Sequence, residues 1–273
     1  MLFLNPRWRL ADVYGPAMQA VLNQQAFAAA KAEISSWPGY EPTPLISGPA
    51  MARAHSVGSA ACKHEGYRFG IGSFKPTGPT YAMLKVLKAA VQRAAGTQVS
   101  TADLVARRYE EITGNIVVSA PTSGNHGRAL AWGAQTFGCR AVLYMNDGVS
   151  AGREAAIAAY GGQVVRVSGA YEDVVQRLHT DAAAQGHIIV GDGGTRDYPD
   201  VPRHIMQGYA LVADELLEQT RDAPLTHLFV PGGGGILAAA CCAHLWDRLG
   251  ARRPKVVVVE PEASRCLQAS AMA

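Results

Sequence analysis

The sequence has no apolar stretch approaching the roughly 20 residues needed to cross a bilayer. Its N-terminus, MLFLNPRWRLADVYG, has too short an apolar run for a secretory signal. Charge is sparse too, because 17% of the 273 residues are charged, the net charge is +3, and no long basic run occurs. We therefore expect a globular cytoplasmic protein with neither a nucleic-acid nor a membrane partner.

Cysteine is scarce and carries no site pattern. The five cysteines are odd in number, and none of their spacings is typical of a metal site, so we predict no metal. Cys241 and Cys242 are adjacent in an apolar, helix-like run. We expect the cysteines to stay reduced as small core residues.

Short apolar segments alternate with helical ones in the second half of the chain. The predicted strands are 115–121, 140–146, 163–169, 187–192, 226–231 and 255–262. Continuously apolar strands between helices predict an α/β fold, with parallel sheets covered on both faces. We predict a smaller α/β domain at 112–190, set within a larger domain formed by 1–111 and 191–273. Ligands in such folds bind at the carboxyl ends of the strands.

The stretch RFGIGSFKPTGPTY, residues 68–81, places Lys75 in a glycine-rich turn. Pro79 and the helix-forming residues after it predict a helix start, with Thr77 as a possible cap. A lysine in a partly dry turn has its charged form disfavoured, which leaves the amine free to attack a carbonyl. Taken alone, the stretch fits a solvated loop lysine better.

A glycine run, PGGGG at 231–235, lies between a predicted strand and a predicted helix. Consecutive glycines leave backbone N–H groups free to surround an anion, and the helix dipole adds to the attraction. No Gly-Lys-Ser/Thr follows the run, and Leu237 stands where the dinucleotide fingerprint has its third glycine. A phosphate monoester fits best, with a tight structural turn as the alternative.

Two further turns follow predicted strands. In TSGNHG, at 122–127, Thr122 or Ser123 can cap a helix, and Asn125 offers a donor and an acceptor. His126 is more often structural than catalytic in such a position. Asp192, between glycines, is either a turn residue or a general base.

Together, a lysine turn, a phosphate-suited glycine run and a polar turn fit a cofactor with an aldehyde and a phosphate, as pyridoxal 5′-phosphate has. The segments FGIGSFKPTGPTYA, TSGNHGRALAWGAQTFG, AYEDVVQRLHTDA, HIMQGYALVADE and VVVVEPE resemble fold-type-II pyridoxal-phosphate enzymes. PGYEPTPL, GNHGRALAW and IMQGY resemble the diaminopropionate ammonia-lyase family more than the threonine and serine dehydratases. The resemblance runs from about Ser36 to the C-terminus.

The resemblance implies a role for each matching residue. Lys75, next to Phe74 at the cofactor, would form the internal aldimine, and Asn125 would hydrogen-bond the pyridine 3-hydroxyl. Asp192 matches an acidic residue near the substrate amine. Four glycines would hold the phosphate: Gly232, Gly233, Gly234 and Gly235. The implied reaction is α,β-elimination of a small amino acid, 2,3-diaminopropionate, to pyruvate and ammonia by a homodimer.

Two departures from the family pattern shape these expectations. Ser123 stands where the ammonia-lyases have an aspartate, and a serine hydroxyl is too weak a base to replace it. We therefore expect turnover of the L-isomer only, with Lys75 as the base, or a preference for hydroxyamino acids as in the threonine and serine dehydratases. The sequence ends at Ala273, where family members continue. We expect an incomplete larger domain, an uncovered sheet edge and weak or absent activity, with a catalytically silent protein or a nucleotide-binding oxidoreductase as alternatives.

Overall fold

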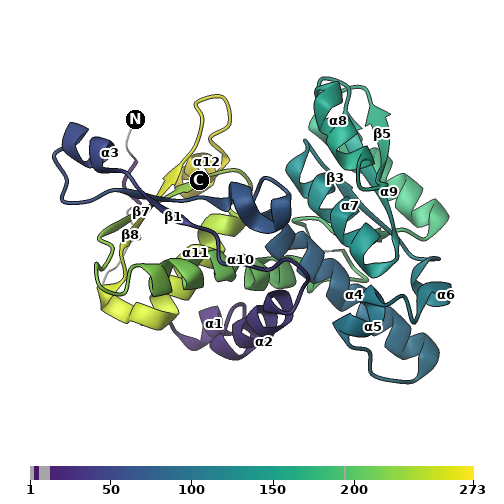
Figure 1. Ribbon diagram of the computed structural model, residues 1–273. Helices are drawn as coiled ribbons and strands as arrows, with labels where there is room; N and C mark the ends of the chain where they lie inside the picture. The colour runs from purple at the N-terminus through teal and green to yellow at the C-terminus, as the bar shows by residue number, and fades with distance from the viewer. Residues whose placement is uncertain (1–2, 6–12, 194) are drawn as a thin grey trace. The chain divides into compact units, whose positions relative to one another are not determined.

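The computed structural model describes residues 3–5, 13–193 and 195–273 (Figure 1). The chain divides into two compact units. The first unit comprises Met1–Ala32, Pro42–Glu65 and Met206–Ala273, and the second comprises Glu33–Glu41 and Gly66–Ile205. The predicted smaller domain, 112–190, lies within the second unit, and the predicted domain boundaries stay a prediction. Residues 1–2 and 6–12 of the predicted larger domain, and Gly194, lie outside the described residues.

The second unit is built on a four-stranded parallel sheet in the order β5-β4-β3-β6 (Figure 1). Its strands are β3 (Val117–Pro121), β4 (Arg140–Asn146), β5 (Gln163–Val167) and β6 (Ile188–Ile189). Three helices connect them: α7 (Asn125–Phe137), α8 (Ala151–Ala158) and α9 (Tyr171–Gln185). The predicted alternation of parallel strands and helices is confirmed. All four strands fall inside the predicted segments.

Helices cover both faces of this sheet. Tyr144 on β4 packs with Val174 and Leu178 of α9. The next residue back, Leu143, points to the opposite face because successive side chains of a strand alternate. There, a β-carbon on Gly127 of α7 would lie 3.1 Å from Leu143 Cγ, so α7 reaches the sheet only because residue 127 is glycine. The carboxyl ends of these strands therefore lead directly into the turns that start the helices.

Helix α4 (Pro79–Ala95) packs tightly on α7. Thr80 Oγ1 donates to the Ala129 carbonyl at 2.9 Å, and a β-carbon at Gly133 would lie 2.4 Å from Met83 Cε. Pro79 is the first residue of α4, as predicted. The predicted cap is wrong, because Gly78 is the N-cap residue and the Thr77 hydroxyl turns back to donate to the Phe74 carbonyl at 3.0 Å.

Aromatic side chains from earlier in the chain pack against aromatic residues of α7. The Trp37 ring lies 6.2 Å from that of Trp132 and 5.6 Å from that of Phe137, and Phe69 lies 4.9 Å from Trp132, all between ring centroids. Trp37 is almost completely buried. Trp37 is thus part of the packing of the second unit.

The first unit holds two small sheets and a helical layer (Figure 1). Strands β1 (Leu45–Ser47) and β2 (Ala61–Lys63) pair antiparallel, and β7 (His227–Pro231) and β8 (Lys255–Val259) pair parallel. Three long helices are α2 (Gln24–Ser35), α10 (Val201–Gln219) and α11 (Ile236–Leu249), and α2 and α10 run on into the second unit. The core beneath β7 and β8 contains Ala213, Cys241 and Leu245.

Short elements complete the described chain. The short α-helices are α1 (Pro16–Gln19), α3 (Pro49–Ala54), α5 (Thr101–Val105), α6 (Glu110–Thr113) and α12 (Cys266–Met272). The 3-10 helices are η1 (Glu65–Gly70), η2 (Lys75–Thr77) and η3 (Gly250–Arg252). Within the described residues, no helix has the length and apolar character needed to span a membrane.

The β7–β8 sheet departs from the expected covering of both faces. Phe229 is 66% exposed and Val259 is 53% exposed, so one side of this two-stranded sheet meets solvent. Cysteine placement also departs from expectation. All five cysteines are free and Cys241 is buried, but Cys62 and Cys266 are exposed and so are not core residues.

A buried ion pair fastens β2 to α10. Lys63 Nζ lies 2.6 Å from Glu215 Oε2, and the two side chains are 8% and 5% exposed. The same ammonium donates to the Thr43 carbonyl at 2.7 Å and to Gln219 Oε1 at 3.0 Å. Lys63 is the positive charge paired with the buried Glu215 carboxylate. Its removal would leave the Glu215 charge buried without that counter-ion.

Replacement of Lys63 by alanine should therefore lower the free energy of unfolding by about 3 kcal/mol. Urea unfolding followed by circular dichroism measures this change. Lys85→Ala is the matched control, since Lys85 is exposed and should change the stability by less than about 0.5 kcal/mol. Equal changes in the free energy of unfolding for the two substitutions would show that the Lys63–Glu215 ion pair does not stabilise the fold.

Candidate active site

Lys75 begins the 3-10 turn η2, which packs against α7 just before α4 starts. Its Nζ lies 5.4 Å from the centroid of the Phe74 ring. Burial lowers the pKa of the Lys75 ammonium below its ordinary value, and the Asp192 carboxylate opposes part of this shift. The lysine is therefore partly desolvated, and its neutral amine is more accessible than that of a lysine in open solvent.

The polar turn before α7 is shaped by Thr122. Its Oγ1 accepts hydrogen bonds from the Gly124 and Gly127 N–H groups, both at 2.9 Å. Gly124 adopts φ +143°, a conformation that glycine readily takes. Of the two predicted capping residues, Thr122 supplies the hydroxyl, while Ser123 and Asn125 stay exposed. The exposed Asn125 amide is thus available to a ligand at the start of α7.

Arg153 of α8 holds this turn from outside. Its Nη1 donates to the Ser123 carbonyl at 2.7 Å. Its side chain also lies over Gly124, where an added β-carbon would be 3.1 Å from Arg153 Cδ. The sequence pattern gave no reason to single out Arg153, because its contact joins residues 30 positions apart.

His126 has a structural hydrogen bond. Its Nε2 lies 2.8 Å from the Val190 carbonyl oxygen, which can only accept, so Nε2 carries the hydrogen. Burial, and then the nearby Lys75 charge, lower the pKa of the His126 ring to about 4. The ring is therefore neutral at pH 7, and its Nδ1 is unprotonated. This favours the structural interpretation of His126 over the catalytic one.

Asp192 lies beside this histidine with its side chain 44% exposed. Its Oδ1 is 3.7 Å from His126 Nδ1, beyond hydrogen-bond distance. The Asp192 carboxylate acts electrostatically on both Lys75 and His126. The second unit therefore brings a desolvated amine and a solvent-accessible carboxylate into one neighbourhood.

A further polar atom lies two residues before the lysine. The Ser73 hydroxyl is buried and has no hydrogen-bond partner within the described part of the chain. An unpaired buried hydroxyl costs about 1–3 kcal/mol. The sequence analysis did not predict Ser73 as a site residue, although it lies two residues before Lys75 in GSFKP. A polar ligand atom at this turn would remove the cost.

The predicted phosphate loop belongs to the first unit, between β7 and α11. The Gly232 N–H donates to the Val259 carbonyl at 2.6 Å. Gly233 and Gly235 adopt φ +122° and +86°, and Gly233 and Gly234 are exposed. Because α11 begins at Ile236, its first N–H groups lie at this loop without partners within the helix. The chemistry of the loop suits an anion.

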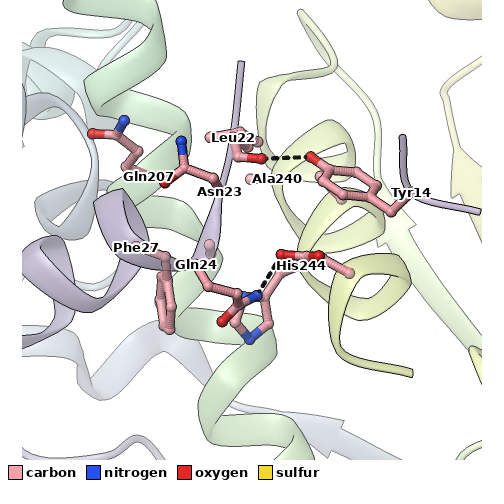
Figure 2. Close-up of a pocket in the computed structure, with 11 residues that line it drawn as sticks. Tyr14, Leu22, Asn23, Gln24, Phe27, Gln207, Ala240 and His244 are labelled. Carbon is pink, nitrogen blue, oxygen red and sulfur yellow. Dashed lines mark hydrogen bonds between the residues drawn. The ribbon is translucent and has the colours of Figure 1, made fainter. Parts of the chain in front are cut away.

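Figure 2 shows a separate pocket in the first unit, lined by α2, α10 and α11. Its residues include Tyr14, Gln24, Phe27 and His244. The Tyr14 hydroxyl donates to the Leu22 carbonyl at 2.9 Å. None of the predicted site residues lines this pocket, and its free space is about that of one water molecule. It is a packing gap and not a ligand site.

Comparison with known proteins identifies a family and several relatives of this chain. The family model described as "Pyridoxal-phosphate dependent enzyme" matches residues 36–273. A diaminopropionate ammonia-lyase from Salmonella typhimurium is 33% identical over 238 residues, which cover 86% of this chain and 59% of that protein. An L-threo-3-hydroxyaspartate ammonia-lyase from Saccharomyces cerevisiae is 35% identical over 54% of this chain and 41% of its own length. The chain thus spans 59% of the length of the first of these curated relatives.

A solved structure shows the same fold. The Escherichia coli diaminopropionate ammonia-lyase in complex with D-serine superposes with a TM-score of 0.86 at 30% sequence identity. The match covers 98% of this chain and 66% of that one. The predicted fold-type-II architecture is therefore confirmed.

The desolvated lysine predicts a pH dependence of stability. Because the folded pKa of Lys75 lies below its ordinary value of 10.5, the unfolded chain binds more protons just below that pH. The free energy of unfolding should therefore increase as the pH rises toward 10.5. Lys75→Met should remove this contribution, whereas Lys85→Met, at an exposed position, should keep it. Urea unfolding between about pH 8 and pH 10 compares the slopes, and parallel slopes for wild type and Lys75→Met would contradict the desolvation.

Proposed function

Because the chain belongs to the family of pyridoxal-phosphate dependent enzymes, we propose that it binds pyridoxal 5′-phosphate and releases ammonia and pyruvate from 2,3-diaminopropionate. The observation that carries the proposal is the desolvated Lys75 amine in a turn packed on α7. The similarity to the diaminopropionate ammonia-lyase of Salmonella typhimurium supports the substrate. The resemblance further suggests a homodimer in the cytoplasm.

The residues present fit this cofactor. In the proposal, Lys75 binds the aldehyde carbon, with Phe74 beside it, and Asn125 hydrogen-bonds the ring hydroxyl. The buried Ser73 hydroxyl, which lacks a partner among the described residues, offers one more polar contact. The phosphate goes to the glycine loop formed by Gly232, Gly233, Gly234 and Gly235, of which Gly233 and Gly234 are exposed.

The proposed chemistry divides between the cofactor and the chain. When bound, pyridoxal phosphate supplies an electron sink that acidifies the α-proton of an amino acid. Desolvation favours the neutral form of Lys75 Nζ, and the neutral amine would accept that proton. The Asp192 carboxylate attracts the ammonium group of the substrate. Ser123 takes no proton, because an unassisted hydroxyl is a poor base at neutral pH.

A second candidate function is elimination from a hydroxyamino acid. Ser123, the residue typical of threonine and serine dehydratases, is the observation that favours it. The match to the yeast hydroxyaspartate ammonia-lyase agrees with this alternative. Pyruvate release from diaminopropionate, compared with that from serine, separates the two candidates.

The lysine assignment predicts the effect of Lys75→Ala. Wild-type protein with added cofactor should gain a visible absorbance band, and Lys75→Ala should lack it, because no amine remains to bind the aldehyde. Pyruvate release should fall by about a hundredfold or more. Lys85→Ala, at an exposed position, is the control that keeps both. A band that survives in Lys75→Ala would rule out the assignment.

The absence of an acid at position 123 predicts stereochemical selectivity. L-diaminopropionate should be turned over, and D-diaminopropionate should not, because only Lys75 can take the α-proton. A coupled assay that reduces pyruvate with lactate dehydrogenase measures both rates. Similar rates for the two isomers would show that another base acts on the D-isomer.

A further inference from the structure

The segment that follows β8 packs against the glycine loop within the first unit. Glu260 accepts hydrogen bonds from the Leu267 and Gln268 N–H groups, both at 2.9 Å, and so caps the start of α12. Cys266, the first residue of α12, donates from Sγ to the Gly233 carbonyl at 2.8 Å. The capped start of α12 is therefore bound to the loop.

Two of the four glycines lie directly against the segment after β8, so this contact alone gives a reason for glycine at each. A β-carbon at Gly232 would lie 2.5 Å from Glu260 Cγ and 3.1 Å from the Val259 carbonyl oxygen. A β-carbon at Gly235 would lie 2.7 Å from Leu267 Cδ2. Both distances under 3 Å exclude alanine unless something moves. One side of the loop is thus filled by Glu260 and Leu267.

The other side of the loop is open. Gly233 is exposed, and a β-carbon there would meet nothing within 4 Å. Its φ of +122° turns the chain in a way that other residues resist. The segment after β8 therefore backs the loop and leaves its outer face free.

We propose that Glu260 is a positioning residue for phosphate binding: by capping α12 it holds Cys266 and Leu267 against the loop, and so fixes the N–H groups of the loop toward solvent. This inference rests on the proposed function, since it concerns the phosphate of the same cofactor. Glu260 acts through the backbone and does not touch the ligand.

The negative charge of Glu260 has to be reconciled with an anionic ligand. Both carboxylate oxygens are engaged by donors, because the Leu267 N–H bonds Oε1 and the Gln268 N–H bonds Oε2. These N–H groups, that of Leu267 first, lower the pKa of the Glu260 carboxyl. Charge-assisted hydrogen bonds of this kind are about twice as strong as neutral ones. We therefore expect loop positioning to outweigh the repulsion between Glu260 and a phosphate. Loss of the Glu260 charge would weaken phosphate binding if loop positioning dominates and would strengthen it if repulsion dominates, so the sign of the change in affinity tells the two apart.

The test compares two ligands that differ only in the phosphate. Wild type, Glu260→Gln and the control Glu262→Gln, at an exposed position, are titrated with pyridoxal 5′-phosphate and with pyridoxal, following the visible absorbance. In Glu260→Gln an amide N–H₂ replaces one acceptor oxygen. The dissociation constant for pyridoxal phosphate should rise roughly tenfold, and that for pyridoxal should change less than about twofold. Glu262→Gln should match wild type.

A second pair of variants tests the contact itself. Gly232→Ala should weaken pyridoxal-phosphate binding strongly, because its β-carbon meets Glu260 Cγ. Combined with Glu260→Ala, which removes that atom, the loss should be clearly less than the product of the two single losses. Independent, multiplicative losses would overturn the proposed contact. Unchanged pyridoxal affinity in each variant shows that the protein is folded.

The outcomes separate this inference from the proposed function. A tighter or unchanged preference for the phosphate-bearing ligand in Glu260→Gln would overturn the inference alone. Inorganic phosphate is the independent probe, since it binds without Lys75 and should slow hydrogen exchange of the Gly233 and Gly234 amides in wild type but less in Glu260→Gln. If phosphate slows exchange in this way but pyridoxal phosphate gives no visible band, the proposed function is refuted and the inference is supported. No protection by phosphate in wild type would overturn the inference.

Discussion

The contact between helices α4 and α7 is the constraint on which the lysine site depends. A β-carbon at Gly133 would lie 2.4 Å from Met83 Cε and 2.6 Å from Thr80 Cγ2, so the two helices touch at van der Waals distance. Both helices start at site turns, because Lys75 lies just before α4 and Asn125 is the first residue of α7. Packing well inside the second unit thus sets where the amine and the amide lie. Interiors packed this closely transmit small changes, so the site depends on residues that take no part in chemistry.

Desolvation then determines the charge states around the lysine. Burial is the largest influence on both Lys75 and His126, and in each case it disfavours the cation. The Asp192 carboxylate opposes it in both cases without reversing either shift. A lysine attacks an aldehyde as the neutral amine, and the lowered pKa of Lys75 favours that form beside an exposed carboxylate. The same burial that costs the fold stability therefore prepares the reactive group.

The sequence predicted the elements of the second unit well, because their signals are local. β-branched runs mark the strands, and glycines at 138 and 186 end helices α7 and α9 in the left-handed conformation. It failed at one local choice, because the Thr77 hydroxyl bonds back to the Phe74 carbonyl in place of capping α4. It failed more generally where the deciding contact is tertiary. Arg153 gave no local signal at all, since its partner is the backbone of another turn. Four glycines suggested a ligand, although two of them lie against Glu260 and Leu267.

Arg153 also bears on how the stereochemical range of such an enzyme can change during evolution. Its guanidinium already binds the Ser123 carbonyl, so an acid introduced at position 123 would arise next to this cation. A neighbouring positive charge lowers the pKa of a carboxyl and makes it a weaker base. An acid introduced at 123 alone would therefore be a weaker base than one without this cation beside it. Positions 123 and 153 are thus coupled through the charge of the guanidinium.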